Sequence, residues 1–166
     1  MKNNKKKIIF KKRTSIKQIE EGSEFCPKFN NFKLLPCITI ENKTKEILMF
    51  SYVNEVALKK TLETKKAHYF SRSRNLLWLK GETSGMYHNV KKILIDDDQD
   101  CLILEVELTK PKKGGKPASC HVGYKSCFYR KVVKTKNGEV TLKFIEEKKS
   151  FDPEKVYEGI TNPTKI

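Results

Sequence analysis

Apolar and polar positions alternate over short stretches along most of the chain, a pattern typical of β-strands. The stretches 34–40 and 47–53 are rich in apolar residues and are separated by a polar turn, so they predict two neighbouring strands. Asn137-Gly138 lies between two further stretches and is the strongest short signal for a hairpin turn. In chain order the predicted strands span residues 34–40, 47–53, 67–71, 76–80, 89–95, 102–108, 128–134 and 139–144.

Only one segment shows the spacing of a main helix. Asn54 is a residue type that favours the N-cap, and apolar residues follow at helical spacing from Val56 to Leu62. The predicted helix therefore ends near Lys65.

At 166 residues the chain has the length of one domain. The prediction is a strand-dominated α+β fold with a small mixed sheet or partial barrel. We expect the domain at residues 31–134, after an irregular basic arm at 1–30 and before a C-terminal hairpin and tail at 135–166.

The formal net charge is +15, which raises the question of a nucleic-acid partner. Nearly all of the 35 basic residues are lysines scattered along the chain, as expected where any solvated charge suffices. We therefore disfavour nucleic acid as the primary partner. The four arginines, which suit bidentate binding of phosphate or carboxylate, are Arg13, Arg72, Arg74 and Arg130.

The chain has no apolar run long enough to span a membrane, and its N-terminus lacks the pattern of a signal peptide. We expect a cytoplasmic protein that does not act at a membrane. Its five cysteines are then expected to be reduced and available for metal binding.

An acidic run at 96–100 is the first candidate metal site. The spacing of Asp96, Asp98 and Asp100 fits the start of a calcium-binding EF-hand loop, but Cys101 stands where that loop needs glycine. The flanking segments also predict strands rather than helices, which excludes an EF-hand. A solvated acidic turn and a site for a hard cation such as Mg²⁺ both remain open.

The second candidate is the segment from Cys120 through His121 to Cys127, because thiolates and imidazole suit Zn²⁺. The gap between the cysteines is too long for a zinc knuckle but allows a loop that presents both thiolates to one metal. Buried structural cysteines are the alternative. Since the acidic run lies close by in sequence, a hard and a soft metal could share one site.

The third candidate lies at 66–85, where arginines, hydroxyl residues and glycines surround a predicted turn. These residues suit a phosphate cradle, and Trp78 or Tyr69 would stack on a base or belong to the core. A hairpin of solvated charge is the alternative. The expected substrate- and phosphate-binding residues are Ser71, Arg72, Ser73, Arg74, Trp78, Lys80, Thr83 and Ser84.

Long motifs in residues 34–131 closely resemble phosphoribosyl-AMP cyclohydrolase of histidine biosynthesis. The most specific are Ser71-Arg72-Ser73-Arg74, Trp78, and Lys80-Gly81-Glu82-Thr83-Ser84-Gly85, followed by the segment 120–130. The resemblance implies a homodimer that adds water at C6 of the adenine ring of phosphoribosyl-AMP and breaks the N1–C6 bond.

The resemblance also implies Zn²⁺ and Mg²⁺ as cofactors. The family's acidic motif reads Asp-Cys-Asp-x-Asp, and its aspartates correspond to Asp96, Asp98 and Asp100 as Mg²⁺ ligands. Zinc is held by that motif's cysteine and by the two that correspond to Cys120 and Cys127, drawn from both subunits.

The sequence departs from the family at several positions. The motif cysteine is replaced by Asp97, so the third zinc ligand is either Asp97 or Cys101, with Cys101 slightly favoured. Met86 and His88 replace an asparagine and a glutamine, and the loop at 110–117 looks longer than the family's.

His68 and His121 are the candidate general bases or proton shuttles, since imidazole titrates near neutral pH. The alternative functions are a basic zinc-bound module that binds RNA or single-stranded DNA, and a catalytically weakened homologue.

Overall fold

A four-stranded sheet forms the centre of the computed structural model, which describes residues 7–162 and 164. Its strand order is β2-β1-β6-β5, formed by β1 (Leu35–Glu41), β2 (Ile47–Val53), β5 (His88–Ile95) and β6 (Leu102–Leu108). β1 and β6 run parallel, whereas the other two pairs are antiparallel. The small mixed sheet confirms the predicted strand-dominated α+β class.

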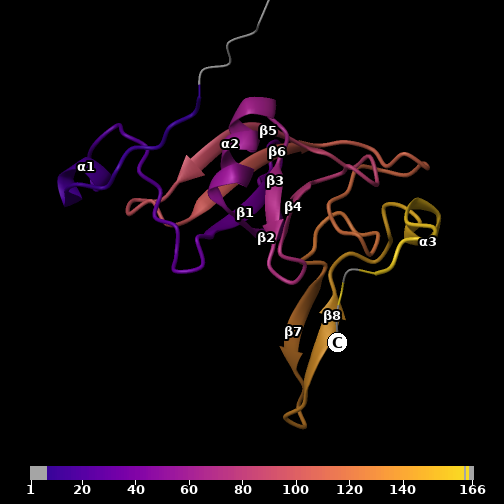
Figure 1. Cartoon of the computed structure of the whole chain (residues 1–166). Coiled ribbons are helices and arrows are strands. Elements are labelled where there is room, and N and C mark those ends of the chain that lie inside the picture. Colours follow the sequence, from indigo (N-terminus) through magenta and orange to yellow (C-terminus); the bar gives the residue numbers. More distant parts are fainter. Residues whose placement is uncertain (1–6, 163, 165–166) are drawn as a thin grey trace, which may run out of the picture.

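Helix α2 (Glu55–Thr64) begins and ends where the sequence predicts. The Asn54 side chain accepts a hydrogen bond from the backbone N–H of Ala57 (2.8 Å), and Lys65 takes the left-handed conformation that closes the helix. The helix contacts β2 and the hairpin of β3 (His68–Ser71) and β4 (Leu76–Leu79), which follows it in the chain (Figure 1). It buries Ala57, Leu58 and Thr61.

The main core lies among α2, the β3–β4 hairpin and the sheet, and its largest fully buried side chains include Tyr69, Leu35, Leu48 and Leu102. The predicted strands match the observed ones with shifts of at most two residues at their ends. Each strand is marked locally, by its apolar residues and by the polar turns that bound it.

The basic N-terminal arm carries a short helix, α1 (Ile16–Glu20), and is otherwise irregular. The side chains of Phe10, Phe25 and Phe29 pack against the main core. Arg13 donates hydrogen bonds to the carbonyl oxygens of Cys26 (2.7 Å) and Asp98 (2.9 Å). The arm is therefore attached to the body at the acidic run.

At the other end of the chain, β7 (Arg130–Lys134) and β8 (Val140–Phe144) form a hairpin that projects from the body (Figure 1). Its turn is at Asn137-Gly138, as predicted, and Gly138 has a φ of +88°. The hairpin crosses the boundary expected at residue 134. A short helix, α3 (Pro153–Val156), follows in the tail, where the sequence indicated no element.

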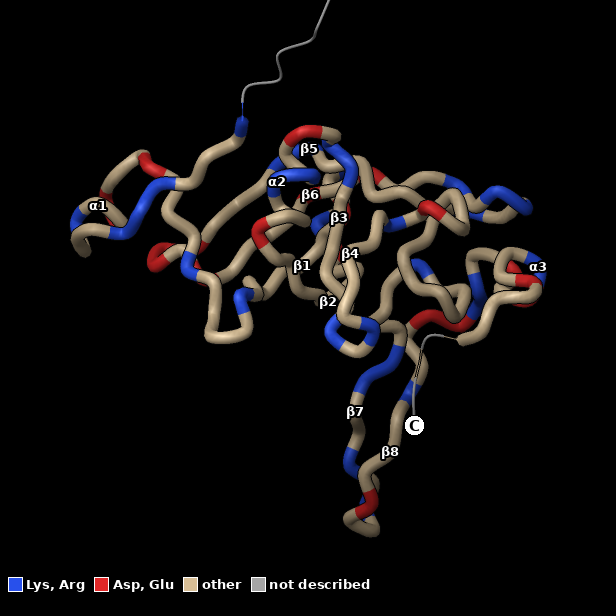
Figure 2. The backbone as a smooth tube through the Cα atoms, in the orientation of Figure 1, with Lys and Arg blue, Asp and Glu red and all other residues tan. Residues whose placement is uncertain are grey.

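Lysine and arginine occur along nearly every segment of the backbone (Figure 2), which agrees with solvated charge. Within residues 7–162 and 164, no helix is both long and apolar enough to cross a membrane.

Candidate active site

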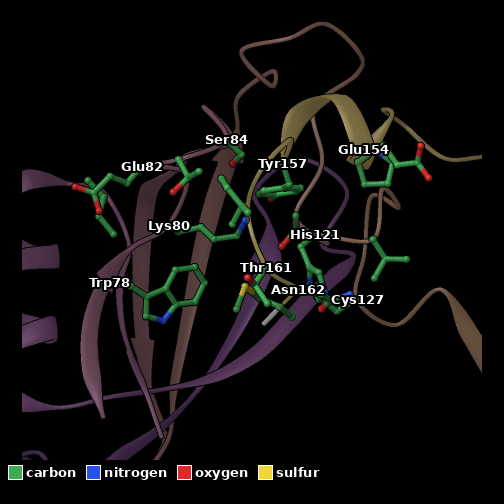
Figure 3. Close-up of a pocket in the computed structure, with 18 of the residues that line it drawn as sticks. Trp78, Lys80, Glu82, Ser84, His121, Cys127, Glu154, Tyr157, Thr161 and Asn162 are labelled. Atoms are coloured by element: carbon green, nitrogen blue, oxygen red, sulfur yellow. The ribbon is translucent and has the colours of Figure 1, made fainter. Parts of the chain in front are cut away.

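A cleft of about 610 Å³ lies beside the β3–β4 hairpin, within the size range of small-molecule sites. Three segments supply its walls: the end of β4 with the following turn, the loop that carries Cys120 and Cys127, and the C-terminal tail. Figure 3 shows Lys80, Tyr157 and His121, one from each segment, around the middle of the cleft.

Backbone geometry that only glycine tolerates shapes the first wall. Gly81 has a φ of +91°, and a Cβ on it would come within 2.3 Å of the backbone nitrogen of Tyr87. The N–H of Gly85 donates to the carbonyl of Gly81 (2.7 Å), which closes a tight turn. The turn presents Thr83 and Ser84 to the cleft, next to Lys80 at the end of β4.

The second wall is a loop closed on itself by backbone hydrogen bonds. The N–H of Cys120 donates to the carbonyl of Tyr124 (3.2 Å), and Gly123 takes a φ of +111° at the turn. The N–H of Cys127 donates to the carbonyl of Leu48 at 2.7 Å, which fixes the far end of the loop to β2. A six-residue gap thereby brings both thiols to one place, as the sequence analysis proposed.

The two thiols lie close enough to shift each other's pKa. A hydrogen bond from Cys127 lowers the pKa of Cys120 to about 7, and the same contact raises the pKa of Cys127. Burial lowers the pKa of the adjacent Lys80 to about 8, while the two cysteines favour its charged form. One thiolate therefore forms easily beside a buried ammonium group.

His121 lines the cleft, and its Nε2 atom is buried with no hydrogen-bond partner among the described residues. Burial lowers the pKa of His121, so its imidazole is neutral at pH 7 and can accept a proton. His68 instead lies beside helix α2, with its Nδ1 atom 2.9 Å from the carbonyl of Lys66, and does not line the cleft.

His88 is fully buried, near enough to the cleft residue Lys80 to be affected by its charge. Its Nδ1 atom lies 3.1 Å from the hydroxyl of Tyr69, which in turn lies 2.8 Å from the hydroxyl of Thr39. Burial holds the pKa of His88 well below its usual value, with the charge of Lys80 acting in the same direction. His88 and Tyr69 therefore belong to a buried polar chain rather than to the cleft surface.

The arginine motif lies at the exposed tip of the β3–β4 hairpin. Arg74 lines the cleft, with its guanidinium 5.8 Å from the ring of Trp78 and its Nε donating to the Ser71 hydroxyl (3.2 Å). The guanidinium of Arg72 lies 4.2 Å from the ring of Tyr52 instead. Within one protomer only Arg74 of this pair reaches the cleft.

The acidic run lies at the opposite end of the β5–β6 hairpin from the cleft. β5 leads from His88, beside the cleft, to Ile95, which at a rise of about 3.4 Å per residue spans about 24 Å. Three residues of the run, Asp96, Asp97 and Asp98, each have a carboxylate oxygen within 4.8 Å of the others, and no other group of three potential metal ligands lies so close among the described residues. One protomer therefore does not bring the acidic run and the cysteine pair into one site.

A lysine already pairs with two of the predicted Mg²⁺ ligands. The Nζ atom of Lys28 lies 2.9 Å from a carboxylate oxygen of Asp98 and 3.2 Å from one of Asp100. Asp96 instead accepts hydrogen bonds from the backbone N–H groups of Asp100 and Cys101. Cys101 is half-buried nearby, and burial raises the pKa of its thiol.

The cleft collects several predicted residues and some that sequence reasoning missed. Predicted residues that line it are Arg74, Trp78, Lys80, Thr83, Ser84, His121 and Cys127. Predicted residues away from its lining are His68, Ser71, Arg72, Ser73, Asp96, Asp97, Asp98, Asp100 and Cys101, while Cys120 lies directly behind it against Cys127. The tail adds Tyr157, Thr161 and Asn162, which no sequence pattern indicated.

The chain is similar to proteins of one family. The family model described as phosphoribosyl-AMP cyclohydrolase matches residues 49–129. A phosphoribosyl-AMP cyclohydrolase of Rhodopseudomonas palustris is 42% identical over 143 residues, which cover 86% of this chain and 93% of that protein. One of Desulforapulum autotrophicum is 52% identical over 124 residues, or 75% of this chain and 90% of the relative.

A longer relative matches as well. The histidine biosynthesis bifunctional protein HisIE of Thermoanaerobacter pseudethanolicus is 46% identical over 127 residues, which cover 76% of this chain and 56% of that protein. The residues that the family model matches include the cleft motifs at 78–84 and 120–127. By these similarities and by the residues that line its cleft, the chain belongs to the phosphoribosyl-AMP cyclohydrolase family.

Proposed function

We propose that this protein hydrolyses the N1–C6 bond of the adenine ring of phosphoribosyl-AMP, in the cytoplasm, as a step of histidine biosynthesis. The observation that carries the proposal is the cleft itself, in which an aromatic ring, cationic groups, a thiol pair and a neutral imidazole meet. All five cysteines are free thiols, as expected in a reducing compartment.

The first wall supplies the groups that would bind substrate. Trp78 offers an aromatic face for the adenine ring, and Arg74 offers a guanidinium for a phosphate. Lys80 and Ser84 add an ammonium group and a hydroxyl deeper in the cleft. These groups would place the adenine C6 atom near the cysteine loop.

The donor set at the cysteine loop fits Zn²⁺. The contact with Cys127 lowers the pKa of Cys120 to about 7, and a thiolate is the form that binds zinc. When bound there, zinc would supply the Lewis acidity that lowers the pKa of a water molecule to about 7. His121 would accept a proton from the attacking water as the water oxygen bonds to C6, and would then return a proton to N1 as the N1–C6 bond breaks.

For Mg²⁺, the acidic run offers the oxygen ligands that this cation prefers. Asp96, Asp98 and Asp100 remain the proposed ligands, with Asp97 as a close neighbour of the first two. Because the ammonium group of Lys28 pairs with Asp98 and Asp100, a magnesium ion would have to compete with it or share these oxygens.

Two features favour a homodimer. With His121 assigned to proton transfer, the described residues of one chain leave two zinc ligands at the cleft, Cys120 and Cys127, whereas catalytic zinc sites use three protein ligands. A second copy would add Asp97 or Cys101 together with its acidic run. In addition, the β7–β8 hairpin exposes Val132, Val140 and Leu142, and an isolated hairpin is marginally stable in water. Contact with a second copy would cover these side chains.

The direct test is turnover of phosphoribosyl-AMP followed by absorbance. We expect turnover that stops when a chelator removes the metals and returns only when Zn²⁺ and Mg²⁺ are added back. A folded, fully metallated protein without turnover would contradict the proposed reaction and favour the weakened homologue. Binding of arbitrary oligonucleotides that weakens with salt and ignores chelator would favour the nucleic-acid module.

Mixing two inactive variants tests whether each site uses both subunits. Cys127→Ser damages the cysteine loop, and Asp96→Asn damages the acidic run. If each site combines the two regions from different chains, a mixed dimer contains one intact site and one site with both defects. Random re-pairing of equal amounts is expected to restore about a quarter of the wild-type activity.

Re-pairing would be carried out by mild denaturation and refolding, with each variant refolded alone as the control. Activity that stays absent in the mixture, although mixed dimers are detected by mass spectrometry, would show that each site uses a single chain.

A further inference from the structure

The C-terminal strap, residues 149–162, is the third wall of the cleft. It contains the short helix α3, which Figure 1 shows lying beside the loops that follow β6. The resemblance in the sequence ended at residue 131 and gave this segment no role. Its place in the structure, across the cleft from Trp78 and next to Ser84, gives it one (Figure 3).

Backbone contacts hold the start of the strap in place. The N–H of Ser150 donates to the carbonyl of Gly123 (2.7 Å), and the carbonyl of Ser150 accepts from the N–H of Lys116 (2.8 Å). A Cβ on Gly115 would lie 2.5 Å from the Cβ of Phe151, and a Cβ on Gly123 would lie 2.9 Å from the carbonyl oxygen of Phe151. The strap therefore fits closely between two glycine-containing loops.

A small apolar cluster fixes the middle of the strap. Phe151 and Val156 pack against Met86 and Ala118, and Tyr157 packs on the edge of this cluster. All four clustered residues are buried, and Met86 is fully so. An ion pair between Lys113 and Glu158 (2.9 Å) adds an exposed contact.

The strap explains two departures from the family pattern. Met86, where the family has asparagine, has a buried apolar environment made largely by the strap, in which an amide would lack partners. The loop at 110–117, which looked longer than the family's, supplies Lys113, Gly115 and Lys116, which all contact the strap. These changes support a fixed wall rather than a loss of the site.

The strap places two polar side chains beside known cleft residues. The Tyr157 hydroxyl lies near the hydroxyl of Ser84. Burial raises the pKa of Tyr157, and this effect is larger than the opposing effect of the Ser84 hydroxyl, which favours the ionised phenol. The phenol therefore keeps its proton at neutral pH and can donate it in a hydrogen bond. Asn162 lies near His121, where its amide favours the charged imidazole.

We propose that the strap is a substrate-binding wall and that Tyr157 is a binding residue, whose hydroxyl donates to a phosphate oxygen of the substrate together with Ser84. A phosphate is the fitting acceptor because three cationic side chains, Lys80, Arg74 and Lys149, line the cleft. They outnumber the two carboxylates in the lining, Glu82 and Glu154. That the bound phosphate belongs to phosphoribosyl-AMP rests on the proposed function. That the strap helps to bind an anion does not depend on it.

The test of Tyr157 uses the single tryptophan, Trp78, which lines the cleft and reports its occupancy by fluorescence. The holoprotein would be titrated with AMP and with ribose 5-phosphate, and KM would be measured with phosphoribosyl-AMP. Tyr157→Phe keeps the ring that packs near Phe151 and removes only the hydroxyl. We expect about a tenfold rise in KM and in the Kd of at least one probe, with kcat changed less than about twofold.

Tyr87→Phe is the matched control, because Tyr87 is half-buried, follows Met86 and does not line the cleft. It should leave both Kd values and KM unchanged. Unchanged Kd values and KM in Tyr157→Phe would overturn the role of Tyr157. If the wild-type protein binds the probes but does not turn over phosphoribosyl-AMP, the proposed reaction fails while the titration still decides the role of the strap.

Neighbouring glycines test the wall as a whole. Gly114 and Gly115 both have positive φ, but a Cβ on Gly114 would meet no atom within 4 Å. Gly115→Ala should therefore push away Phe151, increase amide exchange at residues 151–157 and weaken probe binding, whereas Gly114→Ala should share only the backbone strain. Faster exchange in Gly115→Ala with unchanged affinity would show that the strap is not part of the binding site.

Discussion

Replacing Cys127 with serine is expected to remove both bound zinc and turnover. Cys127 and Cys120 are the only described thiols that meet at the cleft, and a serine hydroxyl does not ionise near pH 7 as a thiol does. Loss of one ligand from a three-ligand catalytic site should lower kcat by about a thousandfold or more. Zinc content would be measured by atomic emission on the same samples as turnover.

The matched control is Cys26→Ser, which changes a buried thiol in the N-terminal arm that does not line the cleft. This variant should keep its zinc. The same measurement on Asp97→Asn and Cys101→Ser distinguishes the two candidates for the third ligand, because only replacement of the true ligand should lower the zinc content. Full zinc content in Cys127→Ser would contradict the proposed site.

Lys80→Met is expected to stabilise the metal-free protein while it weakens substrate binding. Burial lowers the pKa of Lys80 from 10.5 to about 8, so folding at pH 7 carries the cost of a buried charge. At about 1.4 kcal/mol per pKa unit, the free energy of unfolding should rise by on the order of 3 kcal/mol, or roughly 10 °C in Tm. Methionine has a similar length and no charge, so the space stays filled.

The effect has a defined pH dependence. Between the folded pKa of Lys80, about 8, and its unfolded value of 10.5, the folded wild-type protein binds fewer protons than the unfolded chain. The stability of the wild type should therefore rise with pH through this window and approach that of the variant above it. Chemical denaturation at pH 7 and near pH 10 measures both differences.

Lys149→Met is the control for Lys80, because Lys149 also lines the cleft but is exposed. It should change the free energy of unfolding little. A Lys80→Met protein that is less stable than the wild type at pH 7 would show that the ammonium group makes net favourable contacts in the fold.

Local patterns predicted most secondary structure correctly. β2 and β6 match their predicted bounds, and helix α2 starts after Asn54 as the N-cap preference requires. In each case the signal is contained in a few adjacent residues, through alternation, capping or turn propensity. Helix α3 escaped prediction because four residues are too few to show a helical period.

The positions of the predicted site residues required the tertiary structure. Sequence proximity suggested that the acidic run and the cysteine pair could share a site, but β5 carries them to opposite ends of one protomer. Likewise, Arg72 and Arg74 are two residues apart, yet only Arg74 lines the cleft. Residues that are close in sequence are therefore separated in space, in the first case by the length of β5 and in the second by the turn at the tip of the β3–β4 hairpin.

By itself, therefore, the sequence determined the strand-dominated fold class, the family resemblance and the residue types for phosphate, thiolate and imidazole chemistry. These are properties of local segments and of motifs in a fixed order. Only the tertiary structure decided that His121 rather than His68 lines the cleft of one protomer, and that the tail closes it with Tyr157. Those results depend on contacts between segments far apart in the chain, such as Met86 with Phe151, which no local pattern contains.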